Sequence, residues 1–222
     1  AHFAFFNEAL QRLRELEAFR TEGIFRVPGA ADTVSALQRE VAAAACAGRS
    51  EGDSVEGRIR GVLQGCVEPH DMASLLCRWL REQHPMVPSG FHAICARAGL
   101  DSAMAPLPHA AAAEALDQCV DRLPQPGQGL LRALIALLQE VEAGPSRMSP
   151  ASLGRVFAPT VIRRSDPAEM IANTDADTAF VTRLLILLPK STAPDKEDGV
   201  DSDQEASCDS RWGAAAMGNS DT

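Results

Sequence analysis

The chain has 222 residues and a formal net charge of −9, and 45% of its residues are hydrophobic. This length allows one sizeable hydrophobic core or at most two small ones. The acidic balance and the lack of any basic run argue against a nucleic-acid-binding surface. No apolar run approaches the roughly 18 residues that a membrane-spanning helix needs.

The cysteines and histidines show no pattern typical of a metal site. The six cysteines are Cys46, Cys66, Cys77, Cys95, Cys119 and Cys208. No two form a CxxC pair, and none has the Cys/His spacing of a zinc site, so we expect no metal. Without a signal peptide, reduced thiols in a cytoplasmic protein are the simplest interpretation.

Apolar residues recur every three or four positions in the first part of the chain, which predicts helices. One helix is predicted over residues 2–19 and is broken by a glycine-containing loop at 23–29. Asp32 is then expected to cap the next helix. Residues 47–57 are small, charged and glycine-containing, so we expect an exposed loop there.

The same periodicity continues further along. Helices are predicted over residues 70–82, around 130–141, from Ser149-Pro150 to Pro159, and around 180–188. The helix around 130–141 should end at Gly144-Pro145. No run of residues predicts a strand, so the fold class is all-α.

The composition changes near Pro189. Residues 190–222 contain three basic and eight acidic residues and few apolar ones. We expect a helical domain over residues 1–189 and a disordered acidic tail over 190–222. The domain is expected to be one part of a larger multidomain protein.

The segment TEGIFRVPGA, residues 21–30, places Arg26 among apolar neighbours. Ile24, Phe25 and Val27 are expected to anchor this loop to the core. A guanidinium on an anchored loop can bind a phosphate or a developing negative charge. Taken alone, however, the residues favour an arginine that caps helix carbonyls or pairs with Glu22.

Three separated segments together resemble the Rho GTPase-activating (RhoGAP, BCR-homology) domain. TEGIFRVPGA is similar to the arginine-finger loop of that family. EPHDMASLLCRWLREQHPMVP resembles its second motif, and RMSPASLGRVFAPTVIR its third. The order and spacing match over about residues 5–188.

The resemblance implies a single helical domain of about seven to nine helices that binds a Rho-, Rac- or Cdc42-type GTPase in its GTP state. Arg26 would then enter the active site of the partner and accelerate GTP hydrolysis there. The domain would be an activator and not an enzyme, and would need no cofactor, because the partner holds GTP and Mg²⁺. It would reach membranes only through that GTPase or through other domains.

Further site residues follow from the matched motifs. Arg81 matches an arginine that supports the finger loop and the partner contact. Thr160 matches a position that contacts the GTPase, and Pro159 shapes the turn beside it. Gly23, Phe25 and Gly29 are expected to shape the finger loop, the two glycines by allowing sharp turns.

Two of the expected partner-binding positions depart from the family pattern. Cys77 stands where the family normally has a lysine, and Ser152 where it normally has an asparagine. A lost lysine contact at a solvent-exposed rim would weaken binding while the arginine remained in place. The alternative is therefore a catalytically weak or inactive RhoGAP-like module that binds a GTPase as a scaffold.

Overall fold

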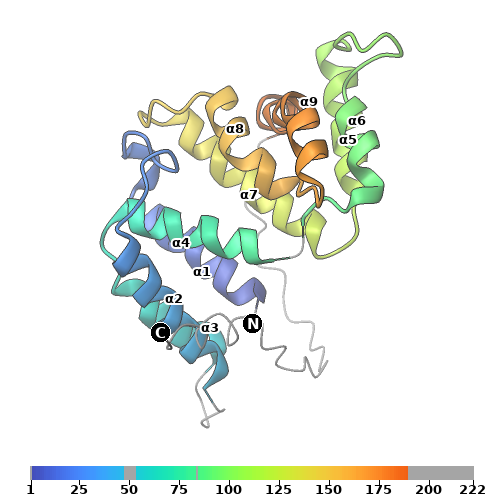
Figure 1. The fold of residues 1–222 in the computed structure, drawn as a ribbon. Coiled ribbons are helices and arrows are strands. Elements are labelled where there is room, and N and C mark those ends of the chain that lie inside the picture. The colour runs from blue at the N-terminus through green and yellow to red at the C-terminus, as the bar shows by residue number, and fades with distance from the viewer. Residues whose placement is uncertain (1, 48–53, 84, 190–222) are drawn as a thin grey trace. The chain divides into compact units, whose positions relative to one another are not determined.

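A computed structural model describes residues 2–47, 54–83 and 85–189 (Figure 1). Within these ranges the chain is helical, with one isolated β-bridge between Leu100 and Pro106. The predicted all-α class is therefore confirmed. The expected tail at 190–222 lies outside the described residues. No described helix is both long and apolar enough to span a membrane.

The elements follow the chain in a simple order. They are α1 (His2–Glu15), the 3₁₀ helix η1 (Ala18–Arg20), α2 (Ala31–Cys46), α3 (Val55–Gln64), α4 (Pro69–Glu82), the 3₁₀ helix η2 (Ser89–Phe91), α5 (His92–Arg97), α6 (His109–Asp121), α7 (Gly127–Ala143), α8 (Pro150–Val161) and α9 (Pro167–Leu187).

The described residues fall into two compact units. The first contains the described parts of Ala1–Leu16 and Pro28–Leu76, and the second those of Glu17–Val27 and Cys77–Thr192. The boundary passes through α4. A single domain over residues 1–189 stays a prediction.

In the first unit, α3 packs against both α1 and α2. A two-point ion pair joins α3 to α1, because Arg60 donates to both carboxylate oxygens of Glu8 at 2.7 and 2.8 Å. At the start of α2, the Ala30 N–H donates to Asp71 at 2.7 Å. The expectation that Asp32 is the N-cap was wrong, since Asp32 lies in the first helical turn.

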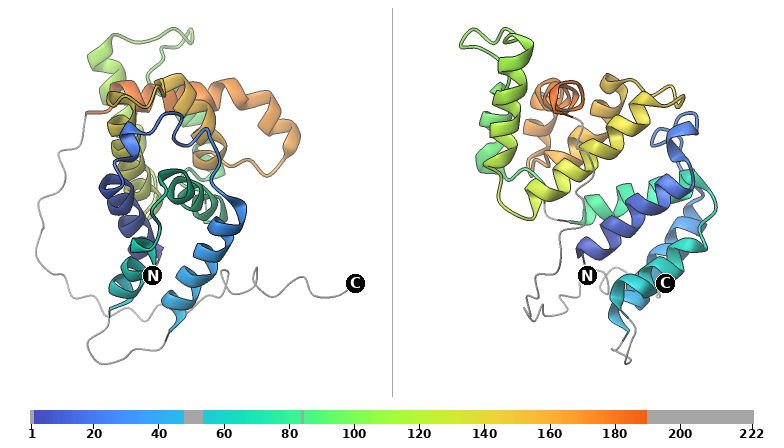
Figure 2. Two further views of the ribbon diagram at one scale, coloured as in Figure 1. Left: turned by 90° about the vertical axis from the view of Figure 1, so that its left-hand side faces the viewer. Right: turned by 180° about the vertical axis from the view of Figure 1, so that it is seen from behind.

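In the second unit, α9 lies between the α7–α8 pair and the α5–α6 pair (Figure 2). Close packing of α8 on α9 requires Gly154, because a Cβ there would overlap the Thr182 hydroxyl and lie 3.0 Å from the Thr178 carbonyl oxygen. The buried Gln139 of α7 donates to the carbonyls of Leu185 and Leu188. Carbonyls at the end of α9 are thereby satisfied without water.

Several element boundaries differ from the prediction. The first helix ends at Glu15 rather than at 19, because Glu17 adopts left-handed backbone angles (φ 50°) that helical hydrogen bonding does not allow. The loop expected over 47–57 gives way to α3 at Val55, which Ser54 caps. Pro159 lies inside α8, two residues before its end, and does not terminate it.

The confirmed elements are those with strong periodicity or caps. α4 and α7 occupy the predicted positions, and α7 ends just before Gly144. Ser149 caps α8, and Pro150 is its first residue.

An ion pair joins the residues after α8 to α9. Arg164 donates to both carboxylate oxygens of Asp177 at 2.7 and 2.8 Å, and both side chains are under 10% exposed. These hydrogen bonds raise the pKa of Arg164. Removing one partner would leave a buried charge without compensation.

We therefore expect Asp177→Ala to lower the free energy of unfolding by about 3–5 kcal/mol. Urea-induced unfolding followed by circular dichroism measures this change. The control is Asp175→Ala, an exposed carboxylate on the same helix, which should change stability by less than about 0.5 kcal/mol. Equal effects of the two substitutions would contradict a structural role for the buried pair.

Candidate functional site

The finger loop, residues 21–27, is a tight turn built around Gly23. The backbone N–H groups of Arg26 and Val27 both donate to the Gly23 carbonyl at 2.9 Å. Gly23 itself has φ +68°, and a Cβ there would lie 3.2 Å from Val27 Cγ2 and 3.3 Å from Arg26 Nη2. Glycine is thus favoured by the backbone angle, and a Cβ would also crowd the ends of the Val27 and Arg26 side chains.

Phe25, the residue before the arginine, adopts left-handed backbone angles. Its φ is +67°, which costs a bulky L-residue about 1–2 kcal/mol. Its ring packs edge-to-face on Phe157 of α8, with centroids 5.1 Å apart and an interplanar angle of 77°. Such a contact contributes about 0.5–1.5 kcal/mol beyond burial and offsets part of the strain.

The α7–α8 loop, residues 144–149, holds the other side of the finger loop. The Gly23 N–H donates to the carbonyl of buried Ser146 at 3.0 Å. The Ser146 hydroxyl in turn donates to the Val141 carbonyl at 2.7 Å. An exposed ion pair of 3.1 Å joins Glu22 to Arg147. The backbone of the finger loop is therefore fixed from α8 and from the α7–α8 loop.

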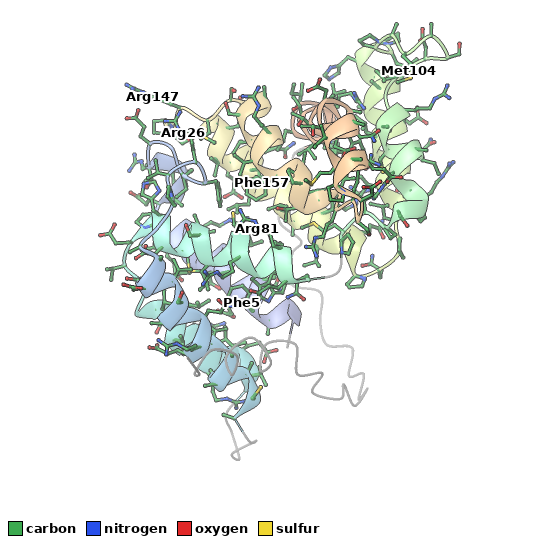
Figure 3. All side chains as sticks on the ribbon, viewed as in Figure 1. Phe5, Arg26, Arg81, Met104, Arg147 and Phe157 are labelled. Atoms are coloured by element: carbon green, nitrogen blue, oxygen red, sulfur yellow. The ribbon has the colours of Figure 1, made fainter. Side chains whose placement is uncertain are left out.

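The side chain of Arg26 is exposed, and its guanidinium forms no hydrogen bond or ion pair with any described residue (Figure 3). Glu22, its alternative partner in the sequence, pairs with Arg147. Ile24 is fully buried and anchors the loop as expected, whereas Val27 is 44% exposed and does not. The arrangement is a rigid backbone that presents an unpaired cation.

Arg81 occupies the last turn of α4 and is also exposed. This turn is tied to the end of α8, because Arg163 donates to the carbonyls of Leu80 and Gln83 at 3.0 and 2.8 Å. The carbonyl of Val161 accepts from the Val87 N–H nearby. These bonds bring the Arg81 turn beside the segment that contains Thr160.

Ser152 and Thr160, the two polar residues of α8 that are expected to contact the partner, differ in burial. Ser152 is partly exposed, and its N–H donates to the hydroxyl of the cap Ser149 at 3.2 Å. Thr160 is only 4% exposed, while Pro159 beside it is exposed. Pro159 is thus better placed than Thr160 to meet another molecule.

Cys77 conflicts with the expectation of a position at a solvent-exposed rim. Its side chain is 8% exposed. Burial raises the pKa of Cys77 to about 12, and the positive charge of Arg81 opposes this shift only in part. The thiol is therefore neutral at pH 7 and presents little surface to a partner.

Gly29 belongs to the other unit and contributes by close packing. Its N–H donates to the Ser74 hydroxyl at 2.8 Å, and a Cβ would lie 2.6 Å from the Asp71 Cα. Its φ is not in the left-handed region, so glycine is needed here for close packing and not for its backbone angle.

Within the second unit, the finger loop, the last turn of α4 and α8 form a candidate binding surface and not a catalytic centre of the usual kind. No group of three or more His, Cys, Asp or Glu in the described ranges is arranged to hold a metal ion. Sequence reasoning missed Ser146, Arg147 and Phe157 as supports of the finger loop. Arg147 and Phe157 lie within the third motif, so for these two residues the sequence identified the segment but not the role.

Comparisons with known proteins agree with this geometry. The family model for the RhoGAP domain matches residues 4–166. The chain is 28% identical over 172 residues to mouse Rho GTPase-activating protein 22, covering 74% of this chain and 22% of that protein. It is 26% identical over 181 residues to GTPase activating protein homolog 3 of Dictyostelium discoideum, covering 78% of this chain and 12% of that protein.

A solved structure gives the same fold. Human Rho GTPase activating protein 15 superposes with a TM-score of 0.62 at 22% identity, over 82% of this chain and 80% of that one. The chain spans less than a quarter of the length of the two curated relatives above. With most of its length matched by the family model, the chain belongs to the RhoGAP domain family.

Proposed function

We propose that this domain activates a Rho-family small GTPase by inserting Arg26 into the partner's active site. The observation that carries the proposal is the exposed, unpaired guanidinium of Arg26 on a loop whose backbone is fixed on both sides. The alternative roles considered for this arginine, capping helix carbonyls or pairing with Glu22, are not seen among the described residues, since Glu22 pairs with Arg147.

The chemistry is electrostatic. During GTP hydrolysis negative charge develops on the phosphate oxygens, and a guanidinium can bridge two of them at once. Because the finger loop is already folded, little conformational entropy is lost when the arginine enters the site. An arginine finger of this kind contributes about 10³–10⁵ in rate. GTP and Mg²⁺ belong to the partner, so the domain supplies charge and positioning only.

We propose that the partner surface includes Arg81, the exposed Pro159 and the rim of Ser152. Arg81 is unpaired among the described residues and suits the acidic or phosphate groups of a partner. Cys77 and Thr160 are buried, so we do not include them among the residues that contact the partner.

Arg26→Ala should lower the stimulated hydrolysis rate by more than about tenfold, because it removes the charge that stabilises the transition state. The measurement is single-turnover GTP hydrolysis by Rho-, Rac- and Cdc42-type GTPases at saturating domain. The matched control is Arg20→Ala, an exposed arginine that pairs with Glu17, which should leave the rate unchanged.

The same assay distinguishes an activator from the alternative, a module that binds a GTPase without accelerating hydrolysis. If several GTPases bind the unmodified domain and none is accelerated, the domain is a binding module that does not activate. If one is accelerated and Arg26→Ala has no effect, Arg26 is not the finger and the proposed mechanism fails.

Gly23→Ala tests the positioning of the finger. A Cβ at φ +68° costs about 1–2 kcal/mol and crowds the Arg26 guanidinium. We expect the maximal hydrolysis rate to fall about tenfold, with a smaller change in the affinity for the GTPase. Gly90→Ala is the control, since nothing lies within 4 Å of a Cβ there. An equal loss of rate and affinity would indicate that the loop serves binding alone.

A further inference from the structure

The second unit contains a pocket that the proposed GTPase contact does not use. Its volume is about 620 Å³, within the range of about 300–1,000 Å³ typical of small-molecule sites. The walls are the α5–α6 loop (residues 98–108), the start of α6, one side of α9, and Arg155 of α8. The first three of these elements lie together in Figures 1 and 2.

The α5–α6 loop forms a preshaped wall. The carboxylate of Asp101 accepts the N–H groups of Ala103 and Ala105 at 2.8 and 2.9 Å. The Leu107 N–H donates to the Gly99 carbonyl at 3.1 Å and closes the base of the loop. A ligand would therefore meet a wall that does not need to be ordered on binding.

Arg183 brings an uncompensated positive charge to this pocket. One of its terminal nitrogens donates to the Ala96 carbonyl at 3.0 Å. Its Nε is buried and has no hydrogen-bond partner. Burial lowers the pKa of Arg183, and no described carboxylate pairs with it. A buried donor left unsatisfied in this way destabilises the structure unless a ligand supplies an acceptor.

The remaining polar groups of the pocket leave that charge unmatched. Arg155 also lines the pocket and forms no ion pair with a described residue, and the one lining carboxylate is Asp175. The hydroxyls of Thr174 and Thr182 donate to carbonyls of their own helix. His109 and Thr178 add an imidazole and a hydroxyl to the lining. The two guanidinium groups outnumber the one carboxylate, in a chain of net charge −9.

We infer that this pocket binds a small amphipathic carboxylate, with its acid group toward Arg183 and Arg155 and its apolar body on the aliphatic wall. That wall is lined by Leu100, Pro106, Leu107, Ala112, Ala179 and Leu187.

The charge and shape of the pocket favour a singly charged ligand. A phosphate dianion would bring a second negative charge close to the carboxylate of Asp175. The apolar wall would be left uncovered by a small inorganic anion. A carboxylate on a short hydrocarbon chain satisfies both parts of the pocket.

This site is separate from the finger loop. Arg155 and Phe157 are two residues apart on α8, so their side chains leave the helix in nearly opposite directions. Phe157 supports Phe25, whereas Arg155 lines the pocket. Binding in the pocket can therefore be measured without any GTPase, and the inference does not depend on the proposed function.

The test is titration of the full chain with octanoate and, separately, with octanamide, which has the same body without the charge. Binding is followed by calorimetry and by chemical-shift changes of backbone amides. We expect octanoate to perturb the amides of Ala112, Thr178 and Thr182, and octanamide to bind at least about tenfold more weakly.

Substitutions of the two arginines show which of them binds the carboxylate. Arg183→Gln should weaken octanoate binding at least about tenfold and Arg155→Gln severalfold, while exposed Arg97→Gln should change it by less than about twofold. Circular dichroism checks that each variant is folded. Octanoate that binds no more tightly than octanamide, perturbs other residues or does not bind up to its solubility limit would overturn the inference, and the comparison of the two probes needs no variant.

Discussion

The contact between the finger loop and the α7–α8 loop determines how this structure presents its arginine. It includes a backbone hydrogen bond from the Gly23 N–H to the carbonyl of Ser146 and the exposed ion pair between Glu22 and Arg147. Ser146 is fully buried, and its own hydroxyl is held by the end of α7. Gly144 allows the start of the α7–α8 loop to pack closely on Phe19, because a Cβ at Gly144 would lie 3.1 Å from the carbonyl carbon of Phe19. The position of the loop is thus set by the packed core of α7.

The second support, α8, connects three parts of the same unit. Phe157 holds the strained Phe25, and Arg163 just beyond the helix holds the last turn of α4 that carries Arg81. On the other side, Gly154 allows α9 to approach closely. A rotation or shift of α8 would therefore move the supports of both arginines together.

The sequence predicts those parts of the fold whose causes are local. The stripes of α4 and α7 and the cap of α8 at Ser149 are each set by residues within one or two helical turns, and they are found where expected. Asp71 caps the start of α2 from a distant part of the chain, so local reasoning chose Asp32 instead. The same is true of the site. The motif predicts that Arg26 is exposed, whereas its supports Ser146 and Phe157 act through tertiary contacts that local reasoning does not reveal.

Cys77 shows why a residue's identity is not enough to assign its exposure. The motif places it where a lysine is usual, and a lysine can extend its ammonium to solvent from a partly buried stem. Cysteine has no such reach, so at the same backbone position its thiol stays among apolar neighbours and remains protonated. The substitution removes a charge from the surface and adds a small apolar group to the packing of α4. If the partner surface is as proposed, the exposed Arg81 in the last turn of α4 then supplies a positive charge that recognises the partner.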